Sequence, residues 1–168
     1  MYFTLLPVLG VSSKANKMAD LAAYYKDKML TNNFSFREMV HSDTAKREGI
    51  NNVPNSPEIF ENLIDLCREL QKIRNVYGPM KINSGFRSEE LNVKIKGSKN
   101  SQHLKGCAAD FVFIDQEIDL FKAYKDISNN PMIGFDQIIF ESKKNKTIEW
   151  IHFSVSDKPR RQSFIIAR

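Results

Sequence analysis

Apolar residues recur at helical spacing through the first half of the chain. The spacing predicts an amphipathic helix over residues 14–30, whose apolar face carries Met18, Leu21, Ala22, Tyr25 and Met29. A longer helix is predicted to begin at Pro57, after the cap residue Ser56, and to end before Gly78. One face of this helix stays apolar, at Ile59, Leu63, Leu66, Leu70, Ile73 and Tyr77.

Shorter helices are indicated by their end signals. Ser35 and Glu38 have the spacing of a capping box, and the flanking residues Phe34 and Met39 have that of a hydrophobic staple. Further short helices are predicted over residues 43–48, 88–96 and 118–128, the first of them ended by Gly49.

Strand patterns follow in the second half. Five strands are predicted, over residues 80–84, 108–113, 136–140, 147–155 and 163–167. The polar segment 142–146 suits a hairpin between the third and the fourth. Hairpin-length connections favour antiparallel pairing, so the predicted fold class is α+β, a small antiparallel sheet flanked by helices.

Size and charge narrow the class of protein. The 168 residues are enough for one domain with its own core. A net charge of +5 favours a polyanionic partner such as nucleic acid, anionic lipid or bacterial wall polymer, and the alternative is a solvated lysine-rich surface. Basic residues are spread along the chain without a nucleic-acid-binding motif, so we expect no nucleic acid partner. The apolar run at residues 1–11 is too short to span a bilayer, so we expect no membrane partner either.

The chemistry-bearing residues lie between residues 81 and 152. Two of the three histidines, His103 and His152, each lie a few residues from a carboxylate. Histidine and carboxylate side chains are ligands that suit zinc. We therefore expect His103, Asp110 and His152 to hold a zinc ion, with the fourth position open for water as in catalytic sites. Cys107 is a weaker alternative ligand, because no second cysteine lies near it in sequence, and Cys67 is expected as a buried thiol on a helix.

Hydrolysis of an amide also needs a group that carries protons. Glu149 is the candidate general base, but alternation along a regular strand would point Glu149 and His152 to opposite faces. Glu149 therefore requires a bulge or an irregular strand start, and Glu141 is the alternative base.

Four more residues are candidates around the substrate. Arg87, at a turn after a strand, could bind a substrate carboxylate or the oxyanion of a tetrahedral intermediate. Ser84 and Ser101 could orient substrate or ligands, and Trp150 could form a pocket wall. The structural alternatives are a surface ion pair for Arg87, a turn or capping role for Ser84 and Ser101, and a place in the core for Trp150.

Three motifs together resemble the M15 zinc peptidases, which include D-alanyl-D-alanine carboxypeptidases and phage endolysin peptidases. They are Ser84-Gly85-Phe86-Arg87, then Ser101-x-His103-x-x-Gly106-x-Ala108-x-Asp110, then Glu149-Trp150-x-His152. The similarity is greatest to the small M15A-like group often encoded by phages, and it extends from Phe34 to Ile166. It implies the same zinc ligands, Glu149 as base and Arg87 as the substrate-binding residue, on a fold shared with the hedgehog signalling domain.

The resemblance implies cleavage of peptidoglycan stems or cross-bridges by a zinc-dependent carboxypeptidase or endopeptidase. The alternative is a phage virion module that keeps the fold and binds the wall, and a zinc-stabilised signalling domain is disfavoured by the presence of both the base and the arginine. Residues 34–168 form the predicted peptidase domain, and residues 1–33 an extension that carries the first helix and could contact virion proteins.

The first eleven residues are apolar but lack the positive start of a signal peptide, which favours a strand or an arm packed on the domain. We therefore expect synthesis in the cytoplasm and action on the bacterial cell wall, either as a lysis protein or within a virion.

Overall fold

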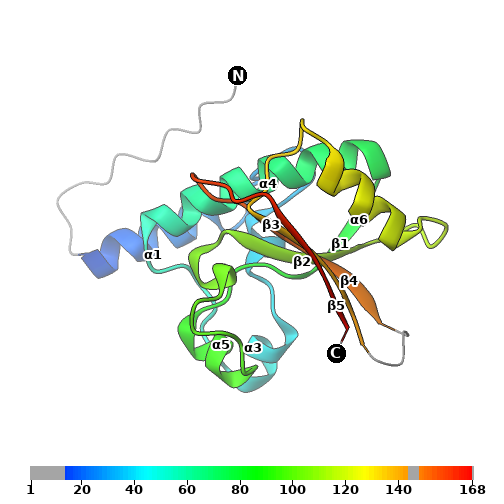
Figure 1. The fold of residues 1–168 in the computed structure, drawn as a ribbon. Helices are drawn as coiled ribbons and strands as arrows, with labels where there is room; N and C mark the ends of the chain where they lie inside the picture. The colour runs from blue at the N-terminus through cyan, green and yellow to red at the C-terminus, as the bar shows by residue number, and fades with distance from the viewer. Residues whose placement is uncertain (1–13, 144–147, 168) are drawn as a thin grey trace.

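The computed structural model describes residues 14–143 and 148–167 (Figure 1). The apolar segment 1–11 and the tip of the predicted hairpin lie outside these residues. The helices are α1 (Lys14–Tyr25), α2 (Phe36–Val40), α3 (Asp43–Glu48), α4 (Pro57–Tyr77), α5 (Glu89–Lys94), the 3-10 turn η1 (Gln102–Lys105) and α6 (Leu120–Asn129). The strands are β1 (Met80–Ser84), β2 (Ala108–Phe113), β3 (Gln137–Ser142), β4 (Glu149–Ser154) and β5 (Gln162–Ala167).

The strands form one five-stranded sheet in the order β1-β2-β4-β3-β5. The predicted α+β class is confirmed, and one detail differs. Three of the four pairings are antiparallel, whereas β5 runs parallel to β3. β4 and β5 run in opposite directions, as expected for strands joined by a short connection, but β3 lies between them. The chain therefore crosses the end of β3 after it leaves β4. As a result β5 pairs with β3, at the edge of the sheet, and runs parallel to it.

α4 packs on the core that the sheet shares, and both of its ends follow from the sequence. Pro57 occupies its first turn, where the missing N–H costs nothing, and Gly78 with φ +80° ends it. Its buried face, which includes the predicted thiol Cys67, comprises Phe60, Leu63, Ile64, Leu66, Cys67, Leu70 and Ile73. Complete burial of a side chain such as Leu63 or Leu70 contributes about 1.5–3 kcal/mol.

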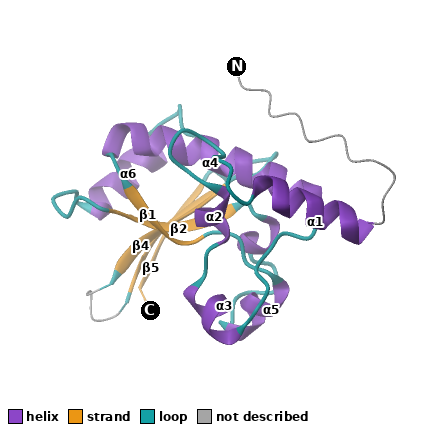
Figure 2. Cartoon of the chain, turned by 180° about the vertical axis from the view of Figure 1, so that it is seen from behind, coloured by secondary structure: helices purple, strands orange, loops and turns teal. Residues whose placement is uncertain are grey.

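The sheet has two different faces. Alternate residues such as Phe111, Ile138 and Phe153 point into the core, where α4 and α6 cover the sheet (Figure 2). The intervening residues, among them Asp110 and His152, therefore lie on the opposite face. We call this opposite face the polar face, and the candidate chemistry lies on it.

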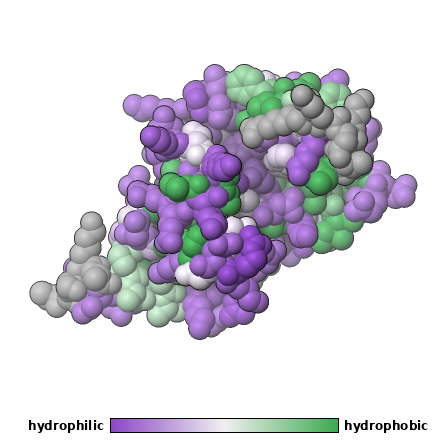
Figure 3. All heavy atoms as spheres, turned by 90° about the horizontal axis from the view of Figure 1, so that it is seen from below, coloured by the Kyte–Doolittle hydropathy of each residue, from purple (hydrophilic) through white to green (hydrophobic). Residues whose placement is uncertain are grey.

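α1 packs on the same core as the rest of the chain. Leu21 and Tyr25 are 2% and 1% exposed, and the Tyr25 ring stacks on Phe60 at 5.1 Å between centroids. The helix ends at Tyr25, earlier than predicted, and Met29 instead pairs with Ser35 in an isolated bridge. None of the described helices has the length and apolarity that crossing a bilayer requires. On the surface seen in Figure 3, apolar residues gather in small areas separated by hydrophilic ones.

Candidate metal centre

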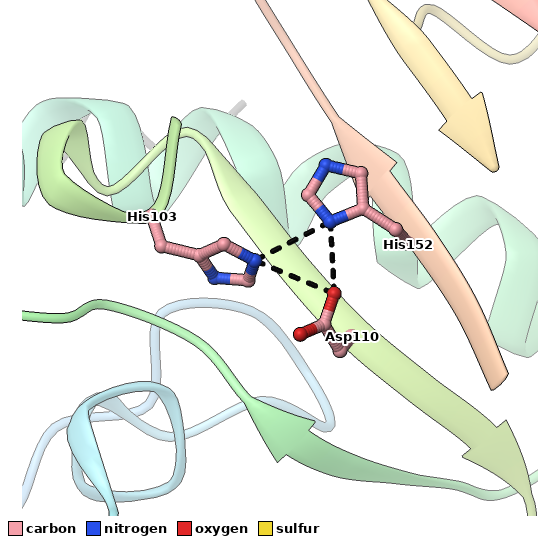
Figure 4. Close-up of side chains that lie close together, drawn as sticks. All are labelled: His103, Asp110 and His152. Atoms are coloured by element: carbon pink, nitrogen blue, oxygen red, sulfur yellow. Dashed lines mark hydrogen bonds and ion pairs between the residues drawn. The ribbon is translucent and has the colours of Figure 1, made fainter. Parts of the chain in front are cut away.

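Three side chains from distant parts of the sequence point toward one another on the polar face (Figure 4). His103 comes from η1, Asp110 from β2 and His152 from β4. His152 Nδ1 lies 2.8 Å from Asp110 Oδ1, and His103 Nε2 lies 3.3 Å from the same oxygen. The two histidine nitrogens are 3.3 Å apart, so the three donor atoms form a small triangle.

This triangle has the dimensions of one face of a zinc tetrahedron. Ligand atoms about 2.0–2.1 Å from a tetrahedral zinc ion lie roughly 3.3–3.4 Å from one another. Two of the three separations are 3.3 Å, and the third is 0.5 Å shorter at 2.8 Å. Two imidazoles and one carboxylate are also a donor set that zinc accepts. The residues present therefore fit a zinc ion bound by three protein ligands.

Sheet register places two of the ligands side by side. Asp110 on β2 pairs directly with His152 on β4, because the antiparallel register matches these two positions. Directly opposite residues on one face have Cβ atoms about 4.5–5.5 Å apart, close enough to share one ion. β2 and β4 are thus a rigid base for the site, and His103 completes it from the loop before β2.

His103 is held by the backbone of the turn after β1. Its Nδ1 lies 2.7 Å from the carbonyl oxygen of Gly85, and its own carbonyl accepts a hydrogen bond from the Arg87 N–H at 3.1 Å. A carbonyl oxygen can only accept, so Nδ1 carries the proton and Nε2 presents its lone pair to the site. His103 is 2% exposed, and this burial lowers its pKa, which favours the neutral ring that a metal needs.

The turn allows this contact only because residue 85 is glycine. A Cβ at Gly85 would lie 2.2 Å from the carbonyl oxygen of Met39, far inside contact distance. The β1–β2 register also shifts between Ile82 and Ser84. The shift turns Ser84 toward Asp110, although Ile82 pairs with the core residue Phe111.

Arg87 orients the carboxylate of Asp110. Its Nη2 donates to Asp110 Oδ2 at 2.7 Å, and its Nε donates to Ser84 Oγ at 2.8 Å. Both partners of the ion pair are nearly buried, with side chains 15% and 13% exposed. Burial alone would raise the Asp110 pKa, but the contacts with His103 and His152 outweigh it and hold that pKa below its usual range. Asp110 thus stays a carboxylate with Oδ1 directed at the two histidines.

The contact of Ser84 with Arg87 fits the ligand-orienting role expected for Ser84, whereas the contact of Arg87 with Asp110 was not expected from the sequence. Substrate binding by either residue remains a prediction, because in this structure the guanidinium and the hydroxyl are engaged with Asp110 and with each other. The segment around Arg87 does line a cavity of about 330 Å³, together with Phe86 and Leu104. Space for a ligand therefore lies beside this part of the site.

The predicted base Glu149 lies at the first position of β4 and outside the triangle. The register of β4 with β3 is continuous from Gln137↔Ser154 to Ser142↔Glu149, so the bulge that Glu149 needs is absent from this pairing. Alternation then directs Glu149 to the face opposite His152. Its role as base remains a prediction, and the geometry weighs against it.

The remaining candidates have separate outcomes. Trp150 lies two residues from His152 on the same strand, hence on the same face, and is half-buried. Ser101 precedes η1 as its cap residue but makes no side-chain capping bond there. Cys107 lies outside the triangle, its Sγ 3.6 Å from the Lys105 carbonyl, and burial raises its pKa to about 11, which disfavours a thiolate.

One supporting cluster was missed by the sequence interpretation. Asp136, whose side chain is 3% exposed, accepts hydrogen bonds from Gln102 Nε2 at 2.8 Å and from Arg160 Nε at 3.0 Å. Gln102 precedes His103 in η1, so this cluster ties the ligand-bearing turn to the segment before β5. No motif could reveal it, because residues 102, 136 and 160 meet only in the folded chain.

One of the comparisons with known proteins agrees with this geometry. A search of curated proteins finds no match to this chain. A family model, described as Peptidase M15, matches residues 32–140. The match includes His103 and Asp110 and stops before His152, which the sheet register brings beside Asp110. It covers more than half of the chain, and the protein therefore belongs to the M15 peptidase family.

Proposed function

We propose that this protein is a zinc-dependent peptidase that hydrolyses peptide bonds in the stems or cross-bridges of bacterial peptidoglycan. The observation that carries the proposal is the triangle of His103 Nε2, Asp110 Oδ1 and His152 Nδ1. Three ligands leave one tetrahedral position for water or substrate, which is the arrangement of catalytic rather than structural zinc. The net charge of +5 supports attraction to an anionic wall polymer.

The chain's own residues prepare the site for amide hydrolysis. A zinc ion held by the three ligands would lower the pKa of a coordinated water and polarise the scissile carbonyl. Gly85 fixes the tautomer of His103, and Arg87 fixes the orientation of Asp110, so both ligand atoms are directed at the site before a metal binds. Such preorganisation is what distinguishes a reactive metal site from adventitious binding.

The test uses defined muropeptides and mass spectrometry. The zinc-loaded protein is expected to release shorter peptides or D-alanine, and a chelator should abolish the release until zinc is restored. The variant His152→Ala should be inactive. The control is His41→Ala, because the side chain of His41 is 58% exposed and not part of the triangle.

Two results would contradict the proposal. Cleavage that survives both the chelator and His152→Ala would remove the metal from the reaction. Binding of the zinc-loaded protein to intact wall without any cleavage would instead favour a wall-binding module that retains the peptidase fold.

A further inference from the structure

The two edges of the sheet are protected to very different degrees. β1, at one edge, has the exposed Lys81, a register irregularity between Ile82 and Ser84, and contacts with α2. A lysine, a bulge and a covering helix are devices that keep an edge strand from pairing with another chain. β5, at the other edge, has neither the lysine nor the irregularity, because its six residues lack charge and proline and its register with β3 is continuous. No other strand in the described part of the chain pairs with it.

β5 also exposes large apolar side chains on both of its faces. Phe164 pairs with Ile139, lies on the polar face and is 42% exposed. Ile165 pairs with Phe140, lies on the face that carries the core residues and is 60% exposed. Exposed apolar side chains on a strand with an open edge are typical of a surface that another chain covers. β5 therefore has the features of an interface strand.

The backbone of β5 shows which residues could pair with a further strand. The N–H of Gln162 donates to the carbonyl oxygen of Asp136 at 2.9 Å, so Gln162 directs its backbone groups toward β3. Successive residues of a strand direct these groups alternately to its two sides. Ser163, Ile165 and Ala167 therefore point their N–H and C=O groups away from β3. These three residues are a regular row of donors and acceptors along the open edge.

We propose that this edge is a dimer interface, in which β5 pairs antiparallel with β5 of a second copy of this chain. A twofold axis at Ile165 places this residue opposite its own copy, and Ser163 of each copy opposite Ala167 of the other. All of these residues direct their backbone groups outward, so each pair exchanges two hydrogen bonds. On the polar face, Phe164 of each copy then lies opposite Ile166 of the other, and the exposed apolar side chains cover one another.

The charge pattern favours a second copy over a foreign strand. Like charges directly opposite each other destabilise a strand pair, and residues 162–167 contain no charge, so self-pairing meets no repulsion. Charged groups are also what specify a foreign partner and its register, and β5 offers none. The two arginines before the strand are engaged within the chain, Arg160 with Asp136 and Arg161 with the Ile133 carbonyl. A self-complementary contact about a twofold axis is the commonest form of oligomer interface.

The dimer places both candidate metal centres on one side. The twofold axis of an antiparallel pair stands perpendicular to the sheet, so the polar faces of the two copies point the same way. Two strand spacings separate β4 from β5 in each copy, and one separates the two β5 strands. At about 4.8 Å per spacing, the two strands that carry His152 lie roughly 24 Å apart. This arrangement follows from the pairing of β5 and does not depend on the proposed peptidase function.

The test is sedimentation equilibrium of the whole chain from about 1 μM to about 500 μM, because an interface smaller than the standard size gives a weak dimer. The wild type should shift from monomer to dimer across this range. Ile165→Lys sets two lysines opposite each other and should raise the dissociation constant about 10-fold or more. Ile165→Pro should have the same effect, because it removes an N–H that faces outward and is not used by β3. The matched control is Ile114→Lys, which changes an isoleucine that is 58% exposed outside β5 and should dimerise as the wild type does.

Amide hydrogen exchange is the second readout. The outward amides of Ser163, Ile165 and Ala167 should exchange slowly in the concentrated wild type, whereas those of Ser163 and Ala167 should exchange rapidly in Ile165→Lys. The Phe164 amide, which faces β3, should stay protected in both, and its protection shows that the variant keeps the native sheet.

Three results would overturn the proposal. The first is a wild type that stays monomeric over the whole concentration range with rapidly exchanging outward amides. The second is a dimer that persists unchanged in both Ile165→Lys and Ile165→Pro, which would put the interface elsewhere. The third is a monomer whose outward amides are protected, since another part of the same chain would then cover the edge. Should Ile165→Lys not fold, Ile165→Pro with native Phe164 protection decides between dimer and monomer.

Discussion

Two arginine–aspartate pairs in this chain have the same contact distance and differ greatly in burial. Arg87 Nη2 lies 2.7 Å from Asp110, and Arg37 Nη2 lies 2.7 Å from Asp27. The side chains are 15% and 13% exposed in the first pair, but 69% and 75% exposed in the second. Replacing each arginine by methionine removes the charge and the donors and keeps most of the aliphatic stem. The comparison therefore measures what burial adds to one contact.

The magnitude follows from the desolvated carboxylate. Removing one partner of a buried ion pair costs about 3–5 kcal/mol, because the other charge stays buried without compensation. Asp110 keeps its contacts with both histidines, so we expect the lower end for Arg87→Met, about 3 kcal/mol. Arg37→Met should cost less than about 1 kcal/mol, as exposed pairs do. For a domain of this size, 3 kcal/mol corresponds to a fall in Tm of about 6–12 °C.

The assay is urea unfolding of the metal-free protein, since bound zinc would stabilise the native state and hide the difference. A zinc titration of the folded variants is the second readout. Arg87→Met should bind zinc about 10–100-fold more weakly, as loss of an outer partner of a ligand does, and Arg37→Met should bind it as the wild type does. Equal stability losses in the two variants, or unchanged zinc affinity in Arg87→Met, would refute the positioning role of Arg87.

Three further predictions address the supports of the site. Gly85→Ala places a Cβ 2.2 Å from the Met39 carbonyl oxygen. We expect this variant to lose about 1–3 kcal/mol of unfolding free energy in urea and to bind zinc more weakly. An unchanged unfolding free energy and an unchanged zinc affinity would contradict the role assigned to this turn. Hydrogen bonds from Arg160 lower the pKa of Asp136 from its ordinary 3.8 to about 2. The ionised Asp136 therefore contributes about 2 kcal/mol to folding stability above pH 4, and this contribution is lost as the pH falls toward 2. Acid unfolding of Asp136→Asn should lack this part of the pH dependence, and an unaltered profile would count against the cluster. Burial raises the pKa of both thiols, so at pH 8 a thiol reagent should label half-buried Cys107 slowly and Cys67 only after unfolding; rapid labelling of native Cys67 would contradict its place in the core.

The amino-acid sequence predicts the parts of this site that depend on residue type and local pattern. His103 and Asp110 flank a glycine turn at the start of an apolar run, and such a run predicts a strand whatever its neighbours are. Gly49 and Gly78, which end α3 and α4 with positive φ, are likewise local signals. These features lie where the sequence places them, within two or three residues.

Features that depend on pairing between strands could not be predicted in this way. Alternation along β4 predicts that Glu149 and His152 lie on opposite faces, but the pairing with β3 decides whether a bulge interrupts that alternation. The parallel pairing of β5 arises because the chain crosses the end of β3 after β4 and adds β5 on the far side of β3. The irregularity between Ile82 and Ser84, which aims Ser84 and Arg87 at Asp110, also has no signature in the sequence of β1.

Zinc titration of the metal-free protein examines the three-ligand site itself. We expect one zinc ion to bind per chain in the wild type and in His41→Ala. Replacing His103, Asp110 or His152 by alanine, one at a time, should remove this binding while the circular dichroism spectrum stays native. Zinc binding that survives in each of these three variants, or a wild-type protein that takes up no zinc, would contradict the account.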